Sequence, residues 1–269
     1  MYTAFQLSNI RCPEEFEMNE SAYSIFAKQF DVVNEKLKHL LSRNEIDGSA
    51  IQDLWFPEIK ADIFISHSHQ DKDMDAAIFL QSWLKTKFNL TAFIDSTVWY
   101  FADDLLKELD LLFCWQSKLK TYNYERRNKT TTHVHMMLAT ALTKMVDACE
   151  CVFFLNTPQS ISIKKGVKEI TYSPWIYYEL SALKTIRKRP QEGLVRKNLS
   201  EQTEKNASLP IYYPVNIKEL PCLNVANLCI WGERCSLPPK KGSSALDELY
   251  SLYSINQLGR LRAAHYPKR

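Results

Sequence analysis

Several features that would assign a protein class at once are missing from this 269-residue sequence. Its 34 Lys and Arg residues nearly balance 31 Asp and Glu residues, so the formal net charge is only +3. A protein that binds nucleic acid through the phosphate backbone needs a larger cationic excess, and we expect no nucleic acid partner. The N-terminus has no basic segment followed by an apolar core, and no apolar run approaches the length of a membrane span. These absences predict a soluble, cytoplasmic protein without membrane contact.

Paired cysteines are also missing. The seven cysteines include no C-x-x-C spacing and lie mostly among apolar residues. An odd number without pairing argues against a disulfide framework or a zinc site, so we expect reduced thiols and no metal. Internal repeats and low-complexity tracts are absent too. Because 45% of the residues are hydrophobic, the chain can bury a core and is predicted to be globular.

The N-terminal part of the chain carries a helical pattern. Apolar residues recur every three or four positions between Asn19 and Asp47, and Asp47-Gly48 ends the pattern. The pattern predicts a long amphipathic helix that precedes the first clear strand. We therefore expect residues 1–59 to form a helical extension and residues 60–269 to form the main domain.

Short apolar segments alternate with helical patterns in the main domain. Strands are predicted at residues 62–66, 91–95, 151–155, 211–215 and 225–231. Helices are predicted at residues 71–88, 133–148 and 174–187, with a last one after residue 242. This alternation is typical of an α/β fold with a parallel sheet and helices on both faces, in which the first three strands are neighbours.

Residues 96–132 interrupt this alternation as a long insertion. A helix is predicted near residues 103–113, whereas residues 121–132 are polar, basic and without apolar rhythm. Long insertions of this kind are usually functional. Its length and the aromatic residues 99–101 predict a flap over a ligand site, and an oligomer contact is the alternative.

Ligands of such sheets bind beyond the carboxyl ends of the strands. Three segments meet there in the predicted fold, at residues 66–69, 95–96 and 173–179. Ser173 suits the N-cap of the last segment's helix and Pro174 suits its first turn. Trp175 and Glu179 share one face of that helix because they are four residues apart. A carboxylate beside an indole is partly desolvated, and an indole can stack against a flat ring. A helix glutamate taken alone is more often an ordinary solvated side chain.

Two of these segments resemble TIR domains. Residues 61–71, Ala-Asp-Ile-Phe-Ile-Ser-His-Ser-His-Gln-Asp, resemble the first strand and loop of that family. Residues 173–180, Ser-Pro-Trp-Ile-Tyr-Tyr-Glu-Leu, resemble its S-x-W-x-x-x-E-L motif, and residues 93–95 between them look like its second strand. The resemblance covers about residues 60–235. The long insertion and the N-terminal helix look most like bacterial anti-phage TIR proteins of the Thoeris type.

The resemblance implies a flavodoxin-like TIR fold and an enzyme of antiviral defence that cleaves NAD⁺ at the nicotinamide glycosidic bond. NAD⁺ is then the substrate, no further cofactor is needed, and Glu179 is the catalytic carboxylate. The product is ADP-ribose or a cyclic ADP-ribose signalling nucleotide that a partner effector protein senses, and TIR to TIR self-association is possible. Substrate-binding positions expected around Glu179 are Phe64, Ser66, His67, Ser68, His69, Asp95, Trp175, Tyr178, His133 and His135.

Some features depart from the family pattern or leave alternatives open. The segment after the second strand is longer than in the family and lacks its usual Pro or Gly, and Ser68 and His69 stand where some TIR enzymes have arginines. His133 and His135 are two positions apart on a helix, so they point to different faces and do not form a joint metal site. One alternative is a non-catalytic TIR adaptor, against which the pair Trp175 and Glu179 argues. Another is a sensor that binds NAD derivatives without turnover.

Overall fold

The computed structural model describes most of the chain, namely residues 3–10, 33–42, 46–68, 71–94, 96, 102–164, 168–186 and 213–253. Its centre is a five-stranded sheet in which every pair of neighbours is parallel. The order of the strands across the sheet is β10 (Cys222–Leu223), β1 (Thr3–Ser8), β6 (Cys151–Asn156), β2 (Ile63–Ser66) and β3 (Ala92–Phe93). No helix among the described residues is both long and apolar enough to cross a membrane.

The three strands predicted at residues 62–66, 91–95 and 151–155 are neighbours. β2 lies between β3 and β6 and pairs in parallel with both. The order β3, β2, β6 follows the second, first and third positions of a flavodoxin-like sheet. The prediction of adjacent parallel strands is therefore confirmed, and the sheet is compatible with that fold class.

The fourth position of the sheet is occupied by a strand that the sequence analysis missed. β1, from the N-terminal segment, pairs with β6 along all six of its residues, from Thr3 to Ser8. Its other edge pairs with β10. The description of residues 1–59 as a helical extension therefore needs correction, because residues 3–8 belong to the central sheet. Residues 33–41 are helical as expected, and residues 19–32 of the predicted helix lie outside the described part.

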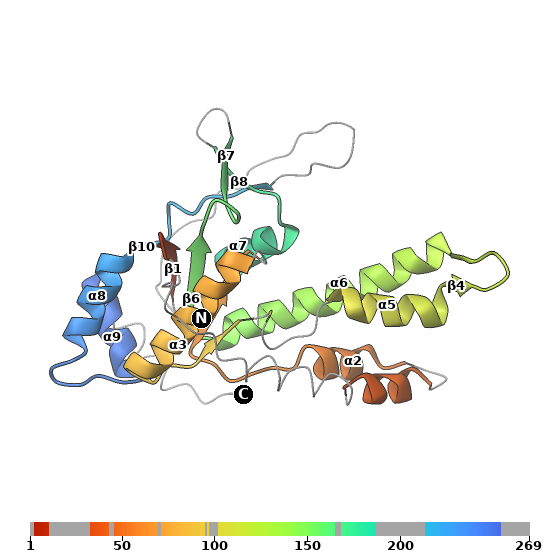
Figure 1. Ribbon diagram of the computed structural model, residues 1–269, viewed down its shortest axis with the longest axis horizontal. Coiled ribbons are helices and arrows are strands. Elements are labelled where there is room, and N and C mark those ends of the chain that lie inside the picture. The colour runs from red at the N-terminus through yellow and green to blue at the C-terminus, as the bar shows by residue number, and fades with distance from the viewer. Residues whose placement is uncertain are drawn as a thin grey trace.

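Helices cover both faces of this sheet (Figure 1). One face carries α3 (Asp71–Phe88), α8 (Val225–Arg234) and α9 (Ser243–Leu252), and the other carries α2 (Gly48–Trp55), α6 (Tyr124–Ala148) and α7 (Pro174–Thr185). Alternate side chains of each strand enter the two cores, as the pleat requires. In β6, Phe153 lies in the α8 and α9 core, whereas Val152 and Phe154 lie in the α6 and α7 core.

The segment predicted as a strand at residues 225–231 is instead the helix α8. Its N-terminus has a capping box in which Asn224 accepts a hydrogen bond from the Asn227 backbone and Asn227 accepts one from the Asn224 backbone. Trp231 from this helix stacks on Phe88 of α3, with 4.0 Å between the ring centres. A short apolar run suits a strand or a buried helix equally well, and here the cap and the packing favour the helix.

The insertion forms a projecting arm, which we define as residues 102–132. It consists of α5 (Ala102–Phe113), the short hairpin of β4 (Trp115–Gln116) and β5 (Thr121–Tyr122), and the first part of α6. The predicted helix near residues 103–113 is confirmed, but residues 124–132, expected to lie outside any helix, continue α6 toward its N-terminus. The arm extends sideways from the sheet (Figure 1). The described part of the insertion is thus not a flap over the strand ends.

A second, smaller sheet lies at the carboxyl end of the central strands (Figure 1). It contains β7 (Ser162–Lys164), β8 (Lys168–Thr171) and β9 (Tyr213–Pro214), all antiparallel. β9 falls within the strand predicted at residues 211–215 but does not join the central sheet. The chain passes directly from β8 through Ser173 into α7, so this sheet borders the candidate site.

Candidate functional site

The start of α7 determines where Glu179 lies. The Ser173 side chain accepts a hydrogen bond from the Ile176 backbone N–H over 3.2 Å, and Pro174 occupies the first turn, as the sequence predicts. Ile176 and Leu180 enter the core beneath the helix. Glu179 is the only charged residue among the buried residues of α7, with 6% of its surface exposed. The helix therefore holds a carboxylate at the border of the core.

Ser66, the last residue of β2, meets this carboxylate. Strand alternation turns Phe64 and Ser66 toward the layer of α6 and α7, whereas Ile63 and Ile65 face α3. The Ser66 hydroxyl donates a hydrogen bond to Glu179 Oε2 in the buried interior. This contact joins the carboxyl end of a central strand to α7 and orients the Glu179 side chain.

The next residue of the same loop binds a different segment. His67 is buried, and its Nε2 lies 3.0 Å from Ser96 Oγ, which follows β3. Ser96 Oγ also lies 3.2 Å from Met74 Sδ on α3. The imidazole thus connects the loop after β2 to the segment after β3, as expected when parallel strand ends meet at one edge.

Ser68 completes the loop with a contact that the sequence analysis did not foresee. Its hydroxyl donates to Asp73 Oδ2, and Thr157 Oγ1, just beyond β6, donates to the same oxygen over 2.5 Å. Asp73 is only 4% exposed. Asp73 falls within the helix predicted at residues 71–88, and the sequence assigns it no role in the site. The polar residues that follow the third strand, Thr157 and Ser160, are the signal in the sequence from which this cluster could have been predicted.

Three consecutive residues, 66–68, therefore contact α7, the segment after β3, and the start of α3, where Asp73 also accepts a hydrogen bond from the segment after β6. We call this set of contacts the 66–68 junction. It lies where the predicted ligand site was placed, at the carboxyl ends of β3, β2 and β6. Hydrogen bonds from Ser66 to Glu179 and from Ser68 and Thr157 to Asp73 hold these two carboxylates in defined positions.

Two predicted site residues, Trp175 and His135, meet at the interface of α6 and α7. Trp175 is half-buried, and its indole stands edge-on to the His135 imidazole with 5.4 Å between ring centres. His135 and His133 are both exposed on α6. The structure therefore brings His135, but not the joint pair of histidines, to the helix that carries Glu179.

Other predicted residues have contacts that stabilise the fold. Phe64 is completely buried and packs 5.5 Å from the Phe93 ring. The Tyr178 hydroxyl donates to the Ala139 carbonyl over 3.0 Å and lies 2.6 Å from Thr143 Oγ1, both on α6. These contacts direct Phe64 and Tyr178 into the core and toward α6 rather than toward the 66–68 junction. The predicted residues 69 and 95 lie outside the described part of the chain.

Comparison of the chain with family models, with curated proteins and with solved structures finds no match. Among the residues that the structure describes, no group of three His, Cys, Asp or Glu side chains is arranged to hold a metal ion. The argument for a function therefore depends on the 66–68 junction, on the pair Trp175 and Glu179, and on the sequence motifs around them.

Proposed function

We propose that this chain is a TIR-like enzyme that cleaves NAD⁺ at the bond between nicotinamide and ribose, with Glu179 as the catalytic carboxylate. The observation that carries the proposal is the buried Glu179 carboxylate at the carboxyl edge of a parallel sheet, oriented by the Ser66 hydroxyl. Trp175 precedes it by one helical turn on the same face. Buried carboxylates in such positions are frequent in active sites, because burying a charge is costly unless it has a task.

The chemistry needs a positioned negative charge. The glycosidic bond breaks with its electron pair leaving on nicotinamide, which departs as a neutral molecule, and the ribose becomes oxocarbenium-like. Glu179 would stabilise that positive charge without itself being consumed. A water oxygen then bonds to the ribose carbon, and release of its proton leaves ADP-ribose. Attack by a group within the same nucleotide would instead give a cyclic product.

The neighbouring residues have supporting roles in this proposal. Trp175 would form a wall against which the nicotinamide ring stacks. Ser66 would position Glu179, and the polar atoms of residues 66–68 would face ribose or phosphate oxygens. The product would act as a signalling nucleotide that an effector protein senses during antiviral defence in the cytoplasm.

Glu179→Gln is the direct test. The exchange keeps the size of the side chain and an oxygen that can accept from Ser66, but it removes the negative charge. We expect NAD⁺ cleavage to fall by a factor on the order of a hundred to a thousand, the usual cost of one positioned group in a water-poor site. Products are measured by chromatography and mass spectrometry, with purified protein and in lysates of phage-infected cells in case a trigger is required.

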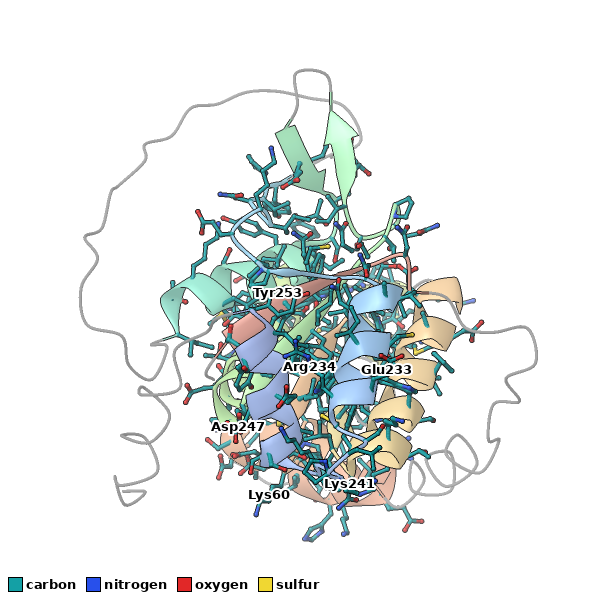
Figure 2. The ribbon with its side chains drawn as sticks, turned by 90° about the vertical axis from the view of Figure 1, so that its left-hand side faces the viewer. Lys60, Glu233, Arg234, Lys241, Asp247 and Tyr253 are labelled. Atoms are coloured by element: carbon teal, nitrogen blue, oxygen red, sulfur yellow. The ribbon has the colours of Figure 1, made fainter. Side chains whose placement is uncertain are left out.

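The matched control is Glu233→Gln, the same exchange at an exposed position on α8 (Figure 2). It should leave the cleavage rate unchanged. A Glu179→Gln protein that melts like the parent and cleaves NAD⁺ at the parental rate would refute the site. A parent protein without turnover under either condition would refute the enzyme proposal and favour a TIR adaptor.

A further inference from the structure

The end of the arm exposes an unusual number of large hydrophobic side chains. Exposed fractions there are 54% for Leu111, 56% for Leu112, 41% for Trp115, 69% for Leu119 and 80% for Tyr124. Single exposed hydrophobic residues are ordinary, but a group of them on one projecting element marks a surface that another molecule covers.

This apolar surface is localised on the arm. The arm extends to one side of the sheet, while α8 and α9 lie on the other side (Figure 1). Figure 2 shows the face with α8 and α9, where charged side chains of both signs surround the helices, among them Glu233, Arg234 and Asp247. α8 and the segment after it also expose Val225, Ile230 and Leu237, so the arm differs from that face in gathering five large hydrophobic side chains on one projecting element.

The arm also carries opposite charges at its two ends. Near its base, residues 102–108 include three acids and one lysine. Near its tip, residues 117–129 include five cations and one acid. Arg127 pairs with Asp110 and Lys129 pairs with Glu125. Within the described residues, the exposed Lys118 and Lys120 have no carboxylate partner, so the tip carries unneutralised positive charge.

The acidic, apolar and basic residues of the arm follow one another along its length, beginning on α5. Leu105 and Leu109 face α6, whereas Asp104, Glu108 and Leu111, at spacings of four and three, share a neighbouring stripe on which both acids are half-buried and Leu111 is exposed. Leu111 is about 10 Å along the helix axis from Asp104, and the turn of the β4–β5 hairpin is at a similar distance on its other side. An acidic base, an apolar centre and a basic tip thus follow one another along the arm.

We propose that this face binds a second copy of the chain, with the two arms antiparallel about a two-fold axis near Leu111. In that arrangement the basic tip of each arm lies on the acidic base of the other, and the central leucines pack against their counterparts. A two-fold interface must be self-complementary, and the order acidic, apolar, basic along one line is self-complementary only when antiparallel. A parallel or tip-to-tip contact would bring like charges together.

An exchange of charges tests this pairing. Lys118→Glu/Lys120→Glu removes the net positive charge of residues 117–129 and makes the turn of the hairpin acidic, and Asp104→Lys/Glu108→Lys makes the base of the arm basic. Size-exclusion chromatography with light scattering should give the mass of two chains for the parent and of one chain for each variant alone. An equimolar mixture of the two variants should return to the mass of two chains, because each tip then meets a base of opposite charge.

The control is Lys60→Glu/Lys218→Glu, which removes the same positive charge at exposed positions outside the arm and should remain a dimer. Circular dichroism verifies that every variant is folded. A monomeric parent, a dimeric Lys118→Glu/Lys120→Glu variant, or a mixture that stays monomeric would overturn the proposal. Binding of the monomeric parent to anionic phosphatidylglycerol vesicles, lost on charge reversal of the tip, would assign this surface to a membrane instead.

Discussion

Ser66→Ala removes the hydroxyl that the end of β2 donates to Glu179 Oε2. Both residues are buried, so water cannot simply replace the lost donor. A hydrogen bond to a charged group contributes about 1.5 to 3 kcal/mol, and we expect a loss of about 2 kcal/mol in the free energy of unfolding. In a chain of this size that corresponds to a decrease of roughly 4 to 8 °C in the melting temperature.

A double-mutant cycle isolates the contact from other effects of the alanine. In the Glu179→Gln background the acceptor is neutral, so Ser66→Ala should cost only about 1 kcal/mol. The difference between the two backgrounds, about 1 kcal/mol, is the interaction free energy of the serine with the charge. Urea denaturation followed by circular dichroism measures all four proteins.

Ser8→Ala is the matched control, because Ser8 ends β1 at the same edge of the sheet but is half-buried, and its hydroxyl lies 3.2 Å from Cys222 Sγ. It should change stability by less than about 0.5 kcal/mol, as most substitutions away from buried networks do. If Ser66→Ala unfolds like the parent and shows no coupling to Glu179→Gln, the 66–68 junction does not orient Glu179.

Three further predictions concern stability and reactivity. Asp110→Asn removes the charge of a buried carboxylate that pairs with Arg127 over 2.8 Å. Hydrogen exchange measured by mass spectrometry should therefore become faster across the arm, and unchanged exchange would show that this ion pair does not stabilise the arm. Tyr178→Phe removes the hydroxyl that donates to α6, so the free energy of unfolding measured in urea should fall by about 1 kcal/mol. The KM for NAD⁺ should stay unchanged, and a raised KM would show that Tyr178 contacts the substrate. Burial raises the pKa of the Cys149 thiol to about 12, so below that pH it stays protonated and unreactive. Alkylation at about pH 8 should modify the exposed Cys229 and spare Cys149 until the chain unfolds, and labelling of folded Cys149 would refute this.

Local patterns predicted those parts of the fold that depend on neighbours in sequence. Ser173 and Pro174 start α7 as expected, because a cap and a first turn are made within a few residues. The spacing of four places Trp175 and Glu179 on one face whatever the rest of the fold does. The adjacency of β2, β3 and β6 followed from the alternation of strands and helices, which permits few topologies.

Two elements, β1 and α8, were not predicted from the sequence, because their local patterns are ambiguous or depend on residues far away in the chain. The strand β1 contains a polar residue, Gln6, which interrupts its apolar run. The Gln6 amide donates to the carbonyls of Ile217 and Leu220, each over 3.1 Å, and accepts from Asn156. These partners are more than 140 residues away, so no local pattern identifies Gln6 as a half-buried strand residue whose side chain is fully hydrogen-bonded. In α8 the apolar run resembled a strand, although its capping asparagines were a readable signal.

The sequence by itself determined that a carboxylate would stand beside an indole on a capped helix, close to the carboxyl ends of parallel strands. Only the tertiary structure decided what holds that carboxylate. Ser66 and Glu179 are 113 residues apart, and Asp73 and Thr157 are 84 apart. A hydrogen bond forms only when the donor–acceptor distance is correct to within a few tenths of an ångström. Such distances are set only after the sheet has closed and the helices have packed, and therefore no periodicity in the chain can specify them.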